Sequence, residues 1–404
     1  MVGKLDIKPD FGVFDAYPDL AYFDSASTAL VPKTSVKATA DFLNTIAVSS
    51  RRGAHRLAVK GSTIVENVRA SLAKFMNTDK SQISFHATVP CTVASFAYGY
   101  DWHREGRNQI VIAQSEEHSI LVALLRVAQV LNLVVKIAPV DQMGILDTEA
   151  LETLVNRQTG IVAVGHMAAG VGVHNPLPEV AHIAHENEAM LLTDATRSLN
   201  FGNDLLHSLG MDVLISSGNV SFMSPPGLVI QWIDKNVGMS HVPGVIGGSA
   251  IGNVTPPSYD IAMQPDKFES GIINVPAIAG LGAALEYIRS LQPRGLLQHM
   301  VALSRYMANR LAETEGLVVY GSHNDSSTIF SFNIAGGNRI SCHDVSLFLD
   351  QSNVAVRSGL LCAHPFVQSL AEEGVVQASL HAYNSLDDID RLADSLRLIL
   401  DQLI

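Results

Sequence analysis

Cys362 and Arg357 are a pair of residues whose types and spacing suggest chemistry. A thiolate is the nucleophilic form of cysteine, and a nearby positive charge favours it. Arg357 lies five residues upstream, and Ser358 and Gly359 between them suit a flexible turn. A free cysteine is more often a small buried hydrophobe, so a reactive thiolate and a buried side chain both remain open for Cys362.

Asp194 is the second candidate, because it ends the β-rich run MLLTD at residues 190–194. In α/β folds, ligands bind at the carboxyl ends of the strands. Arg197 follows three residues later and is a plausible ion-pair partner. The pattern therefore predicts either a structural ion pair or a ligand contact at this strand end.

Other site types are not indicated. No His/Cys cluster has the spacing of zinc ligands, and neither a phosphate loop nor a dinucleotide fingerprint is present. The three cysteines cannot form a disulfide framework and suit a reducing compartment. Of these, Cys91 and Cys342 have no motif around them, and we expect structural roles for both.

The segments that must position these residues alternate between β-rich and helix-like stretches. Near-continuous apolar runs are typical of strands buried on both faces, and their alternation with helices predicts an α/β fold with a mainly parallel sheet. A small α+β domain is expected to follow, giving a large domain over residues 20–285 and a small domain over 1–19 and 286–404. The runs are 82–87, 109–114, 133–140, 160–166, 190–194, 213–218 and 228–233.

Composition excludes several classes of function. With 39 acidic and 27 basic side chains the net charge is −12, so nucleic acid is not an expected partner. Apolar residues make up 47% of the chain, too many for a disordered segment. No long apolar run or signal-peptide pattern is visible, and we expect a cytoplasmic protein without a membrane partner.

Ordered motifs spread over most of the chain resemble those of the cysteine desulfurases of the class V aminotransferase family. This resemblance implies the large fold of transferases that use pyridoxal phosphate (PLP), and an assembly as a homodimer. The segments that carry it are YFDSASTALVP (22–32), RRGAHRLA (51–58), SEEHSILV (115–122), LLTDATRS (191–198), FESGIIN (268–274) and VRSGLLCAHP (356–365).

The resemblance also implies residue roles. Asp194 would pair with the pyridine nitrogen of PLP, and His118 would stack on its ring and transfer protons. Ser217 would bind the phosphate, Arg357 would be the small-domain arginine, and Cys362 would become a persulfide. Arg197 stands where the family has glutamine.

Several matched positions depart from the family pattern. Val220 replaces the lysine that forms the Schiff base with PLP, which excludes a covalent bond there. The other departures are Asn219 and Val89 at phosphate contacts, Ile272 for a threonine that crosses the dimer, Ala169 for an asparagine near the ring, and Gln377 for the arginine that clamps the substrate carboxylate. Together they lead us to expect an apolar cavity that rejects a phosphate, no cofactor and no metal.

Four functions remain open. The chain is expected to be a catalytically silent partner or regulator, or a sulfur relay in which Cys362 accepts sulfur from a desulfurase or another sulfur-transfer protein. Alternatively, it holds PLP noncovalently as a transferase or lyase, or uses Asp194 and His118 as acid–base groups on another ligand.

Overall fold

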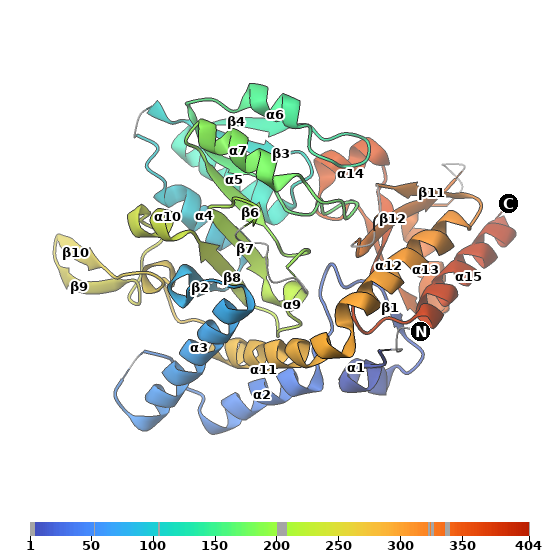
Figure 1. Ribbon diagram of the computed structural model, residues 1–404, viewed down its shortest axis with the longest axis horizontal. Coiled ribbons are helices and arrows are strands. Elements are labelled where there is room, and N and C mark those ends of the chain that lie inside the picture. The colour runs from blue at the N-terminus through green and yellow to red at the C-terminus, as the bar shows by residue number, and fades with distance from the viewer. Residues whose placement is uncertain are drawn as a thin grey trace.

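A seven-stranded sheet forms the centre of the large domain in the computed structural model, which describes residues 5–51, 53–103, 106–199, 208–321, 324, 327–335 and 340–403 (Figure 1). Its strand order is β2-β8-β7-β6-β5-β3-β4, and the neighbours from β4 to β7 pair in parallel. This confirms the predicted α/β class with a mainly parallel sheet. The strands are β2 (Ile83–His86), β3 (Gln109–Ala113), β4 (Val134–Ala138), β5 (Thr159–Ala163), β6 (Met190–Asp194), β7 (Val213–Ser217) and β8 (Val229–Ile233).

Alternate side chains of each strand enter two separate hydrophobic clusters. Ile110 and Ile112 of β3 pack with α4 (Val89–Gly99) and α5 (His118–Leu131). Val111 and Ala113 face the other way, towards the cluster that includes α6 (Thr148–Leu154) and α7 (Leu177–Glu186). Because both faces are buried, the strand sequences are almost continuously apolar.

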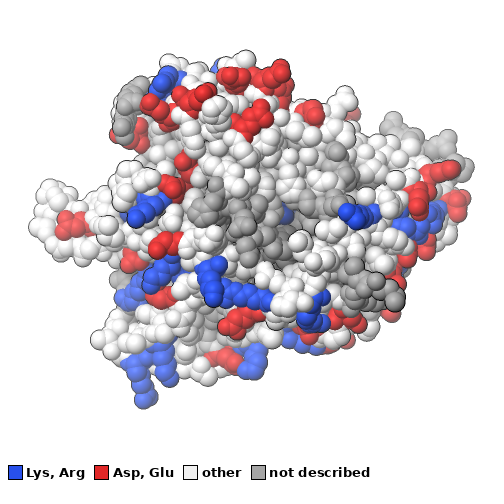
Figure 2. All heavy atoms as spheres, in the orientation of Figure 1, with Lys and Arg blue, Asp and Glu red and all other residues white. Residues whose placement is uncertain are grey.

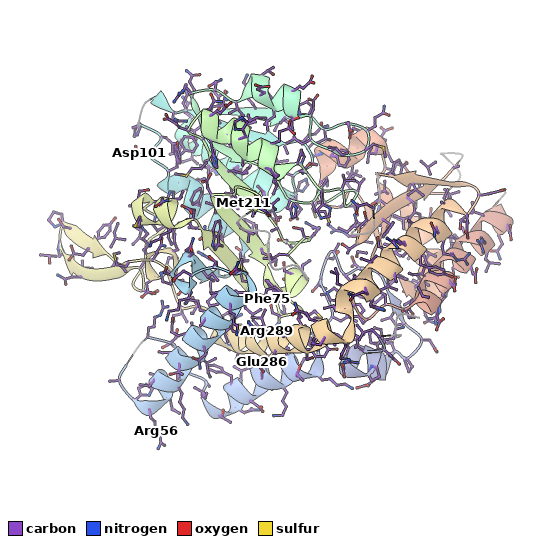
Figure 3. All side chains as sticks on the ribbon, viewed as in Figure 1. Arg56, Phe75, Asp101, Met211, Glu286 and Arg289 are labelled. Carbon is purple, nitrogen blue, oxygen red and sulfur yellow. The ribbon has the colours of Figure 1, made fainter. Side chains whose placement is uncertain are left out.

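Two long helices cross below the sheet, and the second of them leads towards the small domain. They are α3 (Arg56–Phe75) and α11 (Val275–Leu291), and α11 also packs along α2 (Lys33–Thr45). Figure 3 shows Phe75 and Arg289 close together at the crossing, where Arg289 donates hydrogen bonds to the hydroxyl and carbonyl of Ser71.

The small domain contains a four-stranded antiparallel sheet in the order β11-β12-β15-β14. The N-terminal strand β1 (Ala21–Tyr22) pairs in parallel with β13 (Val354–Ala355) of this part of the chain. The remaining elements are β11 (Leu317–Tyr320), β12 (Ile329–Ile334), β14 (Arg357–Gly359), β15 (Val375–Ser379), α12 (Leu296–Ala312), α13 (Cys342–Gln351), α14 (His364–Leu370) and α15 (Leu386–Leu403).

Outside these layers, the hairpin of β9 (Ile251–Thr255) and β10 (Ser258–Ile261) projects from the large domain (Figure 1). Three short α-helices, α1 (Gly12–Ala16), α9 (Gly218–Ser221) and α10 (Lys235–Ser240), and four single 3-10 turns complete the elements of the described residues. No helix within the described ranges is both long and apolar enough to cross a membrane.

Candidate functional site

A cavity of about 420 Å³ lies where β6 and β7 end and the small domain approaches the large one. This volume is within the range of about 300–1,000 Å³ that is usual for small-molecule sites. The cavity is lined mainly by polar and charged side chains: Asp24, Ala26, Ser27, Val89, Glu117, Ser119, Thr196, Arg197, Ser217, Asn219, Val220 and Arg357.

Opposite charges face each other in this cavity. Arg197 and Arg357 are its cations, and Asp24 and Glu117 are its anions. Burial raises the pKa of Asp24, although the Ser27 hydroxyl and the two guanidinium groups act to lower it. The mixture of two cations with two anions suits a ligand that itself carries both signs of charge.

Asp194 lies beneath the cavity lining, buried at the end of β6. Burial raises the pKa of its carboxyl group, while the positive charge of Arg197 and hydrogen bonding to Thr196 oppose that rise. The Thr196 amide donates to Asp194 Oδ1 at 2.8 Å. Arg197 thus stabilises the charged form of Asp194 from the cavity side.

Glu116 is a second buried carboxyl group near Asp194, and sequence analysis missed it. Burial, together with the negative charge of Asp194, raises the pKa of Glu116 to about 8. The Gly165 amide donates a hydrogen bond to Glu116 Oε1. The signal available in the sequence was its position just after β3, at the same edge of the sheet as Asp194.

The Glu116→Gln variant is expected to remove a pH-dependent loss of stability. Because the folded-state pKa of Glu116 lies above its unfolded value, the favourable contribution is complete below about pH 4.5 and is lost as pH rises through about 8. The loss should be on the order of 5 kcal/mol by pH 9. Thermal unfolding of both proteins between pH 5 and 9 measures it, and parallel curves would contradict this assignment.

Cys362 is half-buried, and its Sγ accepts a hydrogen bond from Arg357 Nη2 at 3.1 Å. Arg357 also donates to Ser27 Oγ at 3.3 Å, and the Ser27 hydroxyl donates to Asp24 Oδ1 at 2.5 Å. The guanidinium is therefore fixed between the cavity wall and the thiol.

The loop around Cys362 has an uncommon backbone. Leu361 and Cys362 have φ values of 54° and 55°, in the left-handed region that non-glycine residues seldom adopt. Leu361 is buried, and the Cys362 carbonyl accepts a hydrogen bond from the His118 amide at 2.7 Å. Such backbone strain is typical of functional sites.

Val220 and Val89 are the main apolar side chains of the cavity wall. Ser217 and Asn219 lie beside them: the Ser217 hydroxyl donates to Asn219 Oδ1 at 2.7 Å, and Asn219 Nδ2 donates to Thr28 Oγ1 at 3.1 Å. Since valine has no amine, position 220 cannot bind a carbonyl compound covalently.

Six residues expected at the site lie outside the cavity lining, and two of them, Asp194 and Cys362, contact it from behind through Thr196 and Arg357. The His118 ring packs against His364, with centroids 4.3 Å apart, and its neighbour Glu117 lines the cavity instead. Gln377 Nε2 donates to the Ala169 carbonyl at 3.0 Å, and Ala169 is buried in another hydrophobic cluster. Ile272 is 82% exposed and lines a different cavity, so the wall is more polar than the sequence predicted.

The other cysteines have no part in this cavity. Cys91 is exposed, Cys342 is buried, and all three thiols are free. Within the described part of the chain, no group of His, Cys, Asp and Glu side chains is arranged to hold a metal ion.

Solved structures with this architecture define the class of protein. The chain superposes on an apo cysteine desulfurase from Thermococcus onnurineus NA1 with a TM-score of 0.89 and 28% identity, over 98% of both chains. It superposes on the cysteine desulfurase CsdA from Escherichia coli with a TM-score of 0.87 and 24% identity, again over 98% of both chains. The fold is that of the PLP-dependent transferases.

The chain belongs to the aminotransferase class-V family, whose family model matches residues 21–392. Among its relatives is a cysteine desulfurase of Escherichia coli (strain K12), 29% identical over 99% of both chains. Another is a probable cysteine desulfurase of Methanothermobacter thermautotrophicus, 28% identical over 94% of this chain and 95% of that protein.

The expectation of no cofactor is wrong. The relatives are cysteine desulfurases, and among solved structures of this fold a mutant of C-DES contains glycine covalently linked to its PLP cofactor, at 17% identity and a TM-score of 0.82. These findings point to PLP. The physical reason for the correction is the cavity itself, which is polar and contains two guanidinium groups where an apolar wall was expected.

The residues present fit PLP without a covalent bond. Arg197 supplies positive charge for a phosphate, and Ser119, Thr196 and Ser217 supply hydroxyl groups. Asp194 supplies a buried carboxylate at the end of β6.

Proposed function

We propose that this protein is a cysteine-desulfurase-like sulfur carrier that holds PLP noncovalently and accepts sulfur on Cys362. The observation that supports the sulfur-acceptor role is the 3.1 Å contact between Arg357 Nη2 and Cys362 Sγ beside the charged cavity. The left-handed backbone at Leu361 and Cys362 adds to this support, because it is maintained against its conformational cost.

In this proposal the residues of the chain bind and orient PLP. The Asp194 carboxylate would pair with the pyridine nitrogen, and Arg197 and Ser217 would hold the phosphate. When bound, PLP supplies a ring that accepts electrons from the α-carbon of an amino acid. Glu117 and Asp24 would attract the ammonium group of such an amino acid, and Arg357 its carboxylate.

Sulfur acceptance needs only Cys362, Arg357 and a donor that is itself a persulfide. The Cys362 thiolate attacks the outer sulfur of the donor persulfide and forms a new S–S bond. The donor's S–S bond breaks, and its inner sulfur leaves as a thiolate that takes a proton from water. No net oxidation occurs, and Arg357 stabilises the negative charge on Cys362 before the attack.

We propose that the chain does not release sulfur from cysteine on its own. Val220 offers no amine, and Gln377 donates to the Ala169 carbonyl instead of lining the cavity, so Gln377 does not hold a substrate carboxylate. Purified protein supplied with PLP and cysteine is expected to form no sulfide above the level of free PLP. Sulfide release at the rate of a cysteine desulfurase assayed in parallel would contradict the proposal.

We also propose that the protein forms a homodimer. Ile272, Met263 and Val254 are 82%, 79% and 53% exposed, beside and on the projecting hairpin, and a second copy would cover them. Light scattering is expected to give twice the chain mass of 43.3 kDa. The Ile272→Glu variant should shift the mass towards the monomer, with Leu297→Glu, a 62% exposed residue on α12, as the matched control. A wild-type monomer at micromolar concentration would refute this.

A further inference from the structure

The outer edge of the small-domain sheet has backbone groups without a partner. β11 pairs with β12 on one side only, in the register Leu317↔Ile334 and Val319↔Phe332. The Ala335 amide donates to the Gly316 carbonyl, so the residues of β11 that bond to β12 are the alternate ones, Val318 and Tyr320. The N–H and C=O groups of Leu317 and Val319 therefore point away from the sheet.

The other side of β12 supports this assignment. Leu380 donates to the Thr328 carbonyl, which makes Phe330 and Phe332 the residues of β12 that bond to β15. Phe332 thus faces β15, and its counterpart Val319 must direct its backbone to the open edge. Within the described ranges, no residue pairs with these groups of Leu317 and Val319.

This edge lacks the usual protection against pairing. Edge strands are commonly blocked by lysine, proline or a bulge. β11 has the sequence LVVY without a charge, and its pairing with β12 has no irregularity. Val318 and Val319, whose side chains point to opposite faces, are 42% and 37% exposed. Side chains on both faces of β11 are thus partly exposed, and no charge or bulge in β11 blocks an added strand at its edge.

A cavity of about 370 Å³ adjoins β11 and has acidic residues on its rim. Val318 and Tyr320 form one wall, and Ile340 and Val345 add apolar surface at the start of α13. Glu372 and Glu373 are exposed on the segment before β15. Alternate side chains of a strand added to β11 would lie on the same face as Val318 and Tyr320, towards this cavity.

We propose that β11 binds an extended, basic segment of a partner protein as a fifth strand of the small-domain sheet. Backbone hydrogen bonds to Leu317 and Val319 would hold the segment, and lysine or arginine side chains would meet Glu372 and Glu373. The acidic rim of the cavity selects a basic segment as the occupant. Figure 2 shows that acidic side chains also gather over α6 and α7.

The test uses a short fluorescent peptide of alternating valine and lysine, with a valine–glutamate peptide as its control. Fluorescence anisotropy should show saturable binding of the lysine peptide and at least about tenfold weaker binding of the glutamate peptide, a difference of about 1.4 kcal/mol. Equal binding of both peptides, or none of the lysine peptide at millimolar concentration, would overturn the proposal.

Two neighbouring proline variants distinguish a loss of peptide binding at the edge from a loss of folding stability. Val319→Pro removes an outward N–H, so the protein should keep its melting temperature but lose about tenfold in peptide affinity. Val318→Pro removes an N–H that bonds to β12 and should lower the melting temperature. Unchanged affinity in folded Val319→Pro contradicts the proposal.

A charge-reversal variant keeps the proposal testable if Val319→Pro does not fold. In Glu372→Lys/Glu373→Lys, affinity for the lysine peptide should fall about tenfold and affinity for the glutamate peptide should rise. If the affinities do not change, the acidic rim does not select the partner. A lower solution mass of Val319→Pro than of wild type would show instead that a second copy occupies the edge.

Discussion

Replacing Arg357 with glutamine is expected to slow the reaction of Cys362 with a persulfide or a thiol probe about tenfold at neutral pH, because the charge-assisted contact at the sulfur is lost. Cys362→Ser should abolish sulfur loading at this position altogether. Mass spectrometry of the native protein, after treatment with a small-molecule persulfide, should find one extra sulfur atom on the peptide that contains Cys362.

The chain contains its own controls for this experiment. Cys91 is exposed and outside the cavity lining, so its reaction rate should be the same in wild type and Arg357→Gln. Cys342 is buried and should react only after unfolding. Arg357→Lys keeps the charge but not the planar guanidinium. We therefore expect Cys362 in this variant to react at a rate between those of wild type and Arg357→Gln. If Cys362 reacts only in the unfolded protein, sulfur relay is excluded.

The sheet was predictable because its signal is local. Each of the seven apolar runs overlaps one strand, and all but the mostly exposed edge strand β4 are buried along nearly their whole length. A strand buried on both faces must be apolar at nearly every position. The positions of Asp194 and Ser217 at strand ends followed from the same runs. The contact between Arg357 and Cys362 lies within a single turn, so the sequence spacing was again informative.

The cavity wall was less predictable because it is assembled from distant segments. Asp24, Ser119 and Arg357 meet only when the small domain closes on the strand ends. Counting apolar replacements at Val89, Val220, Ala169 and Ile272 suggested an apolar wall, but only the first two line it. The polar residues of the remaining wall are scattered along the sequence, and no pattern in it predicted that they lie together.

The sequence predicted His118 at the cavity, but the preceding residue, Glu117, lines it instead. Successive residues at a helix start point about 100° apart, so the choice of which one faces a cavity depends on where α5 begins. Glu117 is the N-cap residue of α5 and lines the cavity, whereas the His118 ring lies against His364. Boundaries of this kind are the least determined feature of a sequence, because helix ends are set by tertiary contacts.

The second large effect is expected from Val220→Lys, which adds an amine to the cavity wall. In wild type, PLP should be removed completely by dialysis, and borohydride treatment should leave no cofactor on the peptide that contains Val220. In the variant, the new amine can react with the carbonyl group of PLP, and reduction should fix the cofactor to position 220. Peptide mass spectrometry after reduction distinguishes the two outcomes without an activity assay.

Asp194→Asn in the Val220→Lys background tests whether the cavity, and not the lysine alone, binds the cofactor. Loss of the buried charge beneath the cavity should weaken PLP binding, because a hydrogen bond to a charged group contributes about 1.5–3 kcal/mol, or about one to two decades of affinity. A surface control, Val59→Lys on α3, should remain unmodified, since Val59 is 55% exposed and outside the cavity lining. Equal modification of the lysines introduced at positions 59 and 220 would mean that PLP reacts with any accessible amine and that the cavity does not bind it.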